Sequence, residues 1–333
     1  MEKVLSLIIP TYNMEKYLNK CLDSLIVENM DLLEVLIIND GSKDNSSNIA
    51  HEYETKFPNT FRVIDKENGN YGSCINRGLK EAKGKYIKIL DSDDSFESLF
   101  FNKYISLIKD IDVDLILTDY AIVDENNTIH KICNYNLDSY TIIDFYQLFA
   151  NNNIDFSIQM HGVTYKRENL LSLNYKQTEG ISYTDQEWVY IPITKVKTGI
   201  YFNNVLYKYL VGRTGQTVEK SIMKRQSQQL GFIISSLIEK YSKNTETDYN
   251  CHLLNQLKTQ MYIYQKALIE DSFDIEILKK IDKKIKDNCL ELYQMTNSLS
   301  SFRIKFVKYW RDNNYKSIPF WMKRLIILRE KFN

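Results

Sequence analysis

Residues 86–94 read YIKILDSDD, an apolar run that ends in three carboxylates within four positions. Asp91, Asp93 and Asp94 repel one another, and each carboxylate is costly to remove from water. Such a group needs a cation nearby when the protein works. The stretch therefore predicts a buried strand that leads into a charged site. A helix N-cap is the alternative, because Asp favours helix starts and residues 95–109 have a helical pattern.

The run at 86–90 is one of five apolar, β-branched runs in the first 120 residues, the others being 4–9, 34–38, 61–64 and 113–117. Between them, apolar residues recur at three- and four-residue spacing, the period of amphipathic helices. The first of these helices is expected to start near Asn13. Regular alternation of strands and helices is typical of an α/β fold, with a mostly parallel sheet flanked by helices.

The amino-acid composition and the pattern of apolar residues change near residue 216. Glycine becomes rare, and periodic apolar patterns at 217–243, 250–270 and 273–297 predict helices. Residues 1–215 carry 22 basic and 30 acidic side chains, whereas residues 216–333 carry 21 and 13. We therefore expect a first domain over 1–216 and a helical C-terminal region over 217–333, each with its own partners.

The cysteines and the N-terminal residues indicate the cellular compartment and whether the chain enters a membrane. The five cysteines are scattered without a Cys-x-x-Cys pair, which favours neither a zinc site nor a disulfide framework. The first apolar run is short, interrupted by Ser6 and ended by Pro10, so it is neither a signal peptide nor a bilayer span. We expect a cytoplasmic protein, with peripheral binding to the inner face of the plasma membrane as an option.

Polar residues follow each of the first four predicted strands, at 10–13 (PTYN), 39–42 (NDGS), 65–70 (DKENGN) and 91–94 (DSDD). In an open parallel sheet, ligands bind beyond these carboxyl ends. Neither G-x-G-x-x-G nor a Walker A motif is present. Carboxylates bind phosphates only through a cation, and Mg²⁺ or Mn²⁺ commonly bridges the two. The sequence therefore predicts a site for a divalent metal and a diphosphate.

As an ordered set, PTYNMEKYLNKCLDSL (10–25), EVLIINDGSKDNS (34–46) and KENGNYGSCINRGLKEAKGKYIKILDSDD (66–94) resemble the N-terminal half of a family 2 glycosyltransferase with the GT-A fold. The resemblance covers 4–120 and extends loosely to 183–188 and 209–216. It implies inverting, metal-dependent transfer of a sugar from a UDP-sugar to a hydroxyl of a glycan or lipid-linked acceptor, with Mn²⁺ or Mg²⁺ as cofactor. Bacterial capsule or cell-wall polysaccharide synthesis would be the setting.

The resemblance also implies which turns hold the nucleotide. Thr11 and Tyr12 would flank uracil, and Asp40 would accept a hydrogen bond from its N3–H; a plain turn residue is the alternative for Asp40. Lys66 would reach the diphosphate, unless it is only a solvated charge. The full nucleotide-binding set is Pro10, Thr11, Tyr12, Asp40, Lys66, Asn68, Gly69, Asp91 and Ser92.

The Asp-x-Asp signature of the family falls on residues 91–93. Asp93 is the expected metal ligand, and Asp91 would contact the ribose, the donor sugar or the metal through water. Asp94 would cap the following helix or support the site from behind. In the segment 68–76, Tyr71 and Gly72 depart from the usual family pattern, so the family pattern does not predict the donor-sugar pocket.

Inverting transfer needs a general base for the acceptor hydroxyl. The family places it in an acidic motif that falls on residues 184–188, so Asp185 is the expected base and Glu187 the competing candidate. A capped helix start is the non-catalytic alternative. The guanidinium of Arg213 would suit the diphosphate. His161, Glu187, Trp188, Arg213 and Gln216 form the set expected to line the acceptor side or a loop over the donor.

Residues 303–333 carry nine basic and two acidic side chains, interleaved with aromatics at helical spacing. This pattern suits an anionic membrane surface. Packing on the acidic first domain is the alternative, and no motif supports nucleic acid. The helical region could also mediate a homodimer. For the function itself, two alternatives remain: a catalytically silent sugar-nucleotide-binding module, and a nucleotidyltransferase, against which the lack of a Gly-rich basic loop counts.

Overall fold

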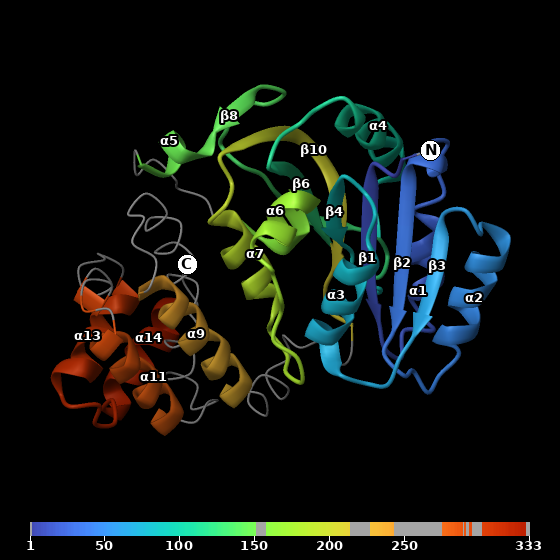
Figure 1. The fold of residues 1–333 in the computed structure, drawn as a ribbon. Coiled ribbons are helices and arrows are strands. Elements are labelled where there is room, and N and C mark those ends of the chain that lie inside the picture. The colour runs from blue at the N-terminus through green and yellow to red at the C-terminus, as the bar shows by residue number, and fades with distance from the viewer. Residues whose placement is uncertain are drawn as a thin grey trace. The chain divides into compact units, whose positions relative to one another are not determined.

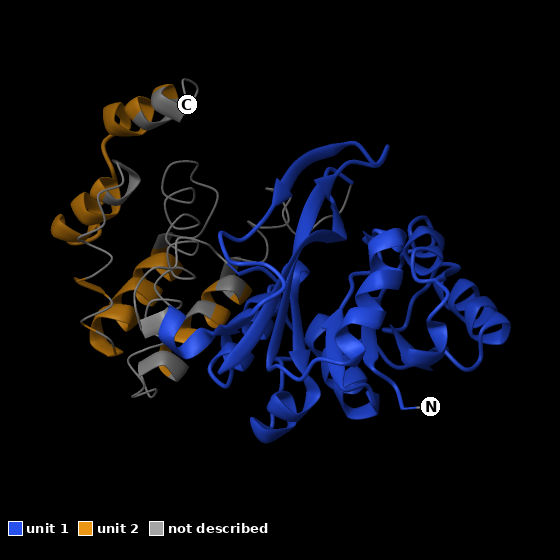
Figure 2. Cartoon of the chain, turned by 90° about the horizontal axis from the view of Figure 1, so that it is seen from above, with its two compact units in different colours: residues 1–214 blue, residues 215–333 orange. Residues whose placement is uncertain are grey.

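The structure is a computed structural model that describes residues 2–150, 158–213, 227–242, 275–288, 290, 293–294 and 302–330. The chain forms two compact units, Met1–Thr214 and Gly215–Asn333, which Figure 2 shows in different colours. This division falls close to the boundary expected after residue 216. The functions expected of the two parts stay predictions.

A mixed sheet of ten strands forms the centre of the first unit (Figure 1). Eight of the strands lie in the order β3-β2-β1-β4-β9-β6-β10-β5, while β7 pairs with β6 and β8 with β10. The five predicted strands are all present, as β1 (Leu5–Thr11), β2 (Leu33–Asn39), β3 (Phe61–Asp65), β4 (Tyr86–Ile89) and β6 (Leu115–Val123). β1 to β4 run parallel, and so do β6 and β10 (Thr198–Leu210). The α/β fold expected from the sequence is confirmed.

β9 (Val163–Lys166) was not predicted from the sequence, and it lies antiparallel between β4 and β6. It separates two strands that would otherwise be neighbours in a simple parallel sheet. Three further short strands, β5 (Ser95–Phe96), β7 (Ile129–Cys133) and β8 (Ile142–Asp144), pair antiparallel at β10 and β6.

Helices cover both faces of the sheet. Alternate residues of β1 point to opposite faces, as the period of a strand requires. Leu5, Leu7 and Ile9 join the core formed with α1 (Leu18–Asp23), α2 (Ser46–Lys56) and α4 (Ser98–Lys109). Ile8 points the other way, against Gly78 of α3 (Asn70–Glu81). The helices α5 (Phe145–Ala150), α6 (Arg167–Ser172) and α7 (Asp185–Ile193) follow later in the chain.

The first helix begins at Leu18, so the start expected near Asn13 is wrong. Asn13 has a φ of 54°, in the left-handed region, where a right-handed helix cannot begin. Its side-chain oxygen accepts a hydrogen bond from the backbone N–H of Lys43 at 2.8 Å, which ties the turn after β1 to the turn after β2.

The second unit contains α9 (Ser227–Ser242), α11 (Ile275–Asn288), α13 (Phe302–Asp312) and α14 (Phe320–Glu330). Arg311 of α13 donates to both carboxylate oxygens of Asp282 of α11, at 2.8 and 2.6 Å, and both side chains are buried. The helix expected at 250–270 and the candidate Gln216 lie outside the described residues. In the part of the chain that the structure describes, no helix is long and apolar enough to cross a bilayer.

Candidate active site

The acidic triad, Asp91, Asp93 and Asp94, follows β4 at the edge of the sheet where β1, β2 and β3 also end. One carboxylate oxygen from each residue lies within 4.8 Å of the others. Like charges at this separation need a cation or a proton between them. The helix α4 begins only at Ser98, with Glu97 as its N-cap residue. The triad is therefore not the N-cap of that helix, and the alternative interpretation of DSDD is wrong.

Asp94 is the structural member of the triad. Its Oδ2 accepts a hydrogen bond from the Tyr207 hydroxyl at 2.6 Å, and its Oδ1 accepts one from the backbone N–H of Leu210 at 2.7 Å. Burial raises the pKa of the Asp94 carboxyl well above its usual range, and the charges of Asp93 and Asp91 raise it further. With both oxygens occupied, Asp94 holds β10 against the site rather than facing a ligand.

Asp91 and Asp93 are half-buried, whereas Asp94 is buried. The Tyr71 hydroxyl donates to Asp91 Oδ1 at 2.8 Å. Removal from water, followed by the charge of Asp93, raises the pKa of Asp91 to about 7. Asp93 forms an ion pair with Arg213, whose guanidinium also lies 5.6 Å from the centre of the Tyr17 ring. The guanidinium of Arg213 is thus a cation of the chain itself that lies beside Asp93 in this structure.

The donor set fits a hard divalent cation. Mg²⁺ and Mn²⁺ prefer carboxylate oxygens, and one or two carboxylates with substrate phosphates are a usual Mg²⁺ site. Asp91 and Asp93 would hold the ion, because the two oxygens of Asp94 are already hydrogen-bonded within the fold. The triad therefore suits a metal with two protein ligands and the remaining positions open.

The turns after β2 and β3 are locked together around Asp40, which is buried. Asp40 Oδ1 accepts hydrogen bonds from Lys66 Nζ and from the backbone N–H of Gly69, the latter at 2.9 Å. The Asn68 side chain donates to the backbone carbonyl of Asp40 at 2.9 Å. Lys66 thus neutralises Asp40 in this structure, and its contact with a diphosphate stays a prediction.

The remaining nucleotide-binding candidates lie along the same edge. Pro10 and Thr11 are the last residues of β1 and are buried, while Tyr12 directly after them is 46% exposed. The backbone carbonyl of Thr11 accepts a hydrogen bond from Asp40 N–H at 2.9 Å. Ser92 is buried between the two candidate metal ligands. The exposed ring of Tyr12 thus follows directly after the residue that bonds Asp40, and an exposed aromatic ring suits a planar nucleobase.

Asp185 is the first residue of α7 and lies close enough to Asp91 and Tyr71 for its charge to raise the pKa of both groups. Burial raises the pKa of Asp185 itself, an effect that hydrogen bonds from Gln186 partly offset. The fold therefore brings sequence positions 91 and 185 close together. A carboxylate with a raised pKa near a metal site is a candidate general base.

Two candidates of the same motif have structural roles instead. Both carboxylate oxygens of Glu187 accept hydrogen bonds from Thr178, from its N–H at 2.7 Å and its hydroxyl at 2.9 Å, and the residue is buried. Trp188 is fully buried, with Tyr165 and Tyr175 packed edge-on at 5.2 and 5.7 Å between ring centres. Their burial corrects the expectation that Glu187 and Trp188 face an acceptor.

His161 lies in a short 3₁₀ turn, Met160–Gly162, among the rings of Tyr120, Tyr207 and Tyr209, with centres 4.3 to 5.0 Å away. Burial, and then the charge of Lys88, lower the pKa of His161 to about 3. The imidazole is therefore neutral at physiological pH. Its contact with Tyr207, the partner of Asp94, places it next to the acidic triad, and its role on the acceptor side stays a prediction.

Three residues that support the site were not assigned a role from the sequence: Tyr71, Tyr207 and Lys88. Lys88 is fully buried, and its ammonium group donates to the carbonyls of His161 and Val163 at 2.8 and 3.0 Å. The signal for Lys88 was a charge inside an apolar strand, and the signal for Tyr71 was its departure from the family pattern. Tyr207 carries no signal in the sequence.

The chain is similar to known glycosyltransferases. Residues 6–170 match the family described as glycosyl transferase family 2. The chain is 28% identical over 247 residues to the uncharacterized glycosyltransferase YibD of Escherichia coli, covering 72% of this chain and 71% of YibD. It is 40% identical over 116 residues to EpsH of Bacillus subtilis, covering 35% of this chain but only 33% of EpsH.

Two solved structures share the fold. One is TarS 1–349 of S. aureus in complex with UDP-GlcNAc, with a TM-score of 0.53, 16% identity and coverage of 87% of this chain and 90% of that one. The other is the mannosyltransferase PcManGT of Pyrobaculum calidifontis in complex with GDP-Man and Mn²⁺, with a TM-score of 0.53, 14% identity and coverage of 95% and 81%. The chain is therefore similar to glycosyl transferase family 2 over residues 6–170, and it has the GT-A fold.

Proposed function

We propose that the protein is an inverting, divalent-metal-dependent glycosyltransferase that moves a sugar from a UDP-sugar to a hydroxyl of a glycan or lipid-linked acceptor. The observation that carries the proposal is the position of Asp185 beside Asp91, at the edge where the nucleotide-binding candidates also lie. A carboxylate base and a metal–diphosphate site are the two parts that such a transfer needs. Capsule or cell-wall polysaccharide synthesis is the proposed setting.

The chain's residues divide the reaction between them. Tyr12 and Asp40 would bind the nucleobase of the donor. Arg213 would leave Asp93 and form an ion pair with the diphosphate instead. A divalent cation on Asp91 and Asp93 would neutralise charge on the nucleoside diphosphate leaving group. Asp185 takes the proton of the acceptor hydroxyl while the oxygen of that hydroxyl forms a bond to the anomeric carbon of the donor sugar. The bond from that carbon to the diphosphate breaks, and its electrons leave with the nucleotide.

The first test is calorimetric titration of the protein with UDP, GDP, CDP and ADP, each with Mn²⁺ and with chelator. The panel includes GDP because a structural neighbour holds GDP-Man. We expect tight binding of UDP that requires the metal. Equal binding of UDP with chelator would remove the metal from the proposal, and binding of none of the four nucleotides would remove the donor site.

The Asp185→Asn variant separates binding from chemistry. Asn keeps the shape of the side chain but cannot take a proton, so UDP affinity should stay within about twofold while transfer falls by about 10² to 10⁴, the usual contribution of a general base. Glu187→Gln is the comparison variant at the competing candidate, whose oxygens accept hydrogen bonds from Thr178 within the fold. Transfer by Asp185→Asn at the wild-type rate would assign the base to another residue.

A further inference from the structure

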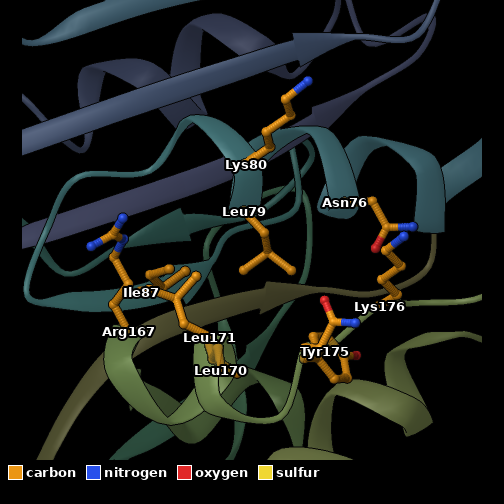
Figure 3. Close-up of a pocket in the computed structure, with 10 residues that line it drawn as sticks. Asn76, Leu79, Lys80, Ile87, Arg167, Leu170, Leu171, Tyr175 and Lys176 are labelled. Atoms are coloured by element: carbon orange, nitrogen blue, oxygen red, sulfur yellow. The ribbon is translucent and has the colours of Figure 1, made fainter.

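A second pocket in the first unit is separate from the acidic triad. It has a volume of about 270 Å³ and lies between the C-terminal half of α3, β4 and the segment that begins with α6. Figure 3 shows Leu79, Ile87, Leu170 and Leu171 grouped at its centre. Leu171 is 55% exposed, so part of this apolar group is open to solvent. A cavity near the lower end of the size of ligand pockets accepts a headgroup or a short chain, not a large molecule.

Basic side chains surround the apolar group. Arg167 lies on one side of it and Lys176 on the other, while Lys80 also lines the pocket but extends away from its centre (Figure 3). Within the described ranges, none of the three has a carboxylate at ion-pair distance. The acids nearest in sequence have partners of their own: Glu81 pairs with Arg62 and Arg77, and Glu168 with Lys166.

Arg167 has the strongest need of a partner. It is half-buried, and its Nε is enclosed without a hydrogen-bond acceptor among the described residues. A buried donor without a partner costs free energy, and more so when it is charged. The planar guanidinium matches the oxygens of a phosphate better than any other side chain. An anion at Arg167, continued by an apolar chain over the leucines, would satisfy both halves of the pocket.

We propose that this pocket binds an anionic lipid, with the phosphate at Arg167 and the start of the chain on Leu79, Leu170 and Leu171. The proposal is independent of sugar transfer, because no pocket residue belongs to the proposed catalytic set. The polar group Asn76 is already engaged, since it donates to the carbonyl of Gln177 and to Glu179, both at 2.8 Å. Arg167 is thus the main charged contact, with Lys176 acting at longer range.

The test uses the full chain and a lipid in monomeric form, so that binding to a membrane surface plays no part. Dihexanoyl phosphatidic acid below its micelle concentration is titrated by calorimetry without nucleotide, and dihexanoyl phosphatidylcholine and inorganic phosphate are the comparison ligands. We expect phosphatidic acid to bind about tenfold or more tightly than either, because each of the others lacks the net charge or the chain.

Variants locate the site. Arg167→Gln and Leu171→Asp should each weaken binding of phosphatidic acid by about tenfold. Lys83→Gln is the matched control, an exposed cation after the same helix that does not line the pocket. If Arg167→Gln unfolds, Lys176→Gln replaces it, with a smaller loss of affinity expected.

Three outcomes would each overturn the proposal. They are an equal loss of affinity for Lys83→Gln, equal affinity of the wild type for phosphate alone, and wild-type affinity of both pocket variants. Metal-dependent UDP binding by the same variants should not change, which separates this test from that of the proposed function.

Discussion

Asp93 and Asp94 are neighbours in sequence, but their partners differ. Asp94 accepts hydrogen bonds from Tyr207 and from Leu210 N–H, whereas Asp93 faces the site and pairs with Arg213. Asp94→Ala would leave two buried donors without acceptors, so we expect a loss of about 2–4 kcal/mol in the free energy of unfolding. Asp93→Ala should cost less than about 1 kcal/mol, because Arg213 keeps its contact with the Tyr17 ring and the charge of Asp91 nearby.

The measurement is urea unfolding of both variants, together with calorimetric titration of UDP and Mn²⁺. Asp93→Ala should keep the fold and lose metal-dependent UDP binding. If Asp93→Ala binds UDP and Mn²⁺ as wild type does, the assignment of Asp93 as a metal ligand fails. If Asp94→Ala is as stable as wild type, the structural role of Asp94 fails.

Lys88 makes stability depend on pH. Burial lowers the pKa of Lys88 to about 7, from 10.5 in the unfolded chain. Between these values the unfolded state binds more protons than the folded state, so the free energy of unfolding rises with pH. The slope from this residue alone approaches about 1.4 kcal/mol per pH unit. We expect Lys88→Met to lose that slope.

Urea unfolding at a series of pH values from about 7.5 to 9.5 checks the Lys88 prediction. Every other titrating group is shared, so the difference between the wild-type and Lys88→Met curves isolates Lys88. The two curves should diverge as pH rises, with wild type gaining stability. Parallel curves would show that Lys88 keeps an ordinary pKa in the folded protein.

The roles of single residues could be predicted only where they follow from local sequence. The acidic triad and Asp40 come directly after apolar runs, so their place at the sheet edge was predictable. Tyr207 and Asp94 are separated by 113 positions, and Lys88 meets carbonyls 73 and 75 positions away. No local pattern encodes contacts over such separations. The burial of Glu187 and Trp188 likewise depends on how the segment from Thr178 folds back on α7.

At the scale of elements, Gly72 fixes the distance between α3 and the segment around Thr178. A Cβ at Gly72 would lie 1.9 Å from the backbone oxygen of Thr178, so one methyl group must displace that segment. Thr178 in turn holds Glu187 of α7, the helix that begins with Asp185. We expect Gly72→Ala to lower the free energy of unfolding by about 1–3 kcal/mol through overpacking, and to reduce transfer by moving α7.

Arg77→Ala is the control for Gly72→Ala, since it introduces the same residue on the exposed side of α3. Denaturant unfolding and the transfer rate are measured for both variants. Arg77 forms only a surface ion pair with Glu81, so its loss should stay below about 1 kcal/mol. Equal stability of Gly72→Ala and wild type would mean that the close approach of the two backbones is not required.

The strands were more predictable than their order. Apolar runs bounded by polar turns identify β1, β2, β3, β4 and β6 in the sequence, because a strand buried on both faces needs such a run. β9 has only four residues and no turn signal of its own, and its insertion between β4 and β6 is set by tertiary pairing. The late start of α1 depends on the left-handed backbone of Asn13. Asn tolerates this conformation, but the presence of an Asn in the sequence does not predict it.

At the scale of the whole chain, the two units differ in charge and the basic tail divides into two kinds of helix. The part after residue 215 carries an excess of eight basic side chains. In α13, Phe306, Val307 and Trp310 are buried, and Arg311 pairs with Asp282 of the same unit. In α14, Phe320, Trp321, Leu325 and Leu328 are each more than half exposed, and Arg324 lies over the Phe320 ring at 5.0 Å. Exposed aromatics beside basic residues suit the interface of an anionic membrane.

We therefore expect α14 to bring the chain to anionic vesicles. Phe320→Ser with Trp321→Ser removes two exposed aromatic side chains without touching the core, so binding should fall by about tenfold or more while stability is unchanged. Leu99→Ser is the control, because Leu99 is 86% exposed on α4. Co-sedimentation with vesicles of phosphatidylglycerol and phosphatidylcholine is measured in the wild-type and Arg167→Gln backgrounds, so that the lipid pocket does not obscure the result. Binding should weaken as salt rises, since about 1 kcal/mol per basic residue is electrostatic. Vesicle binding by the double variant at the level of Leu99→Ser would place the membrane contact elsewhere in the chain.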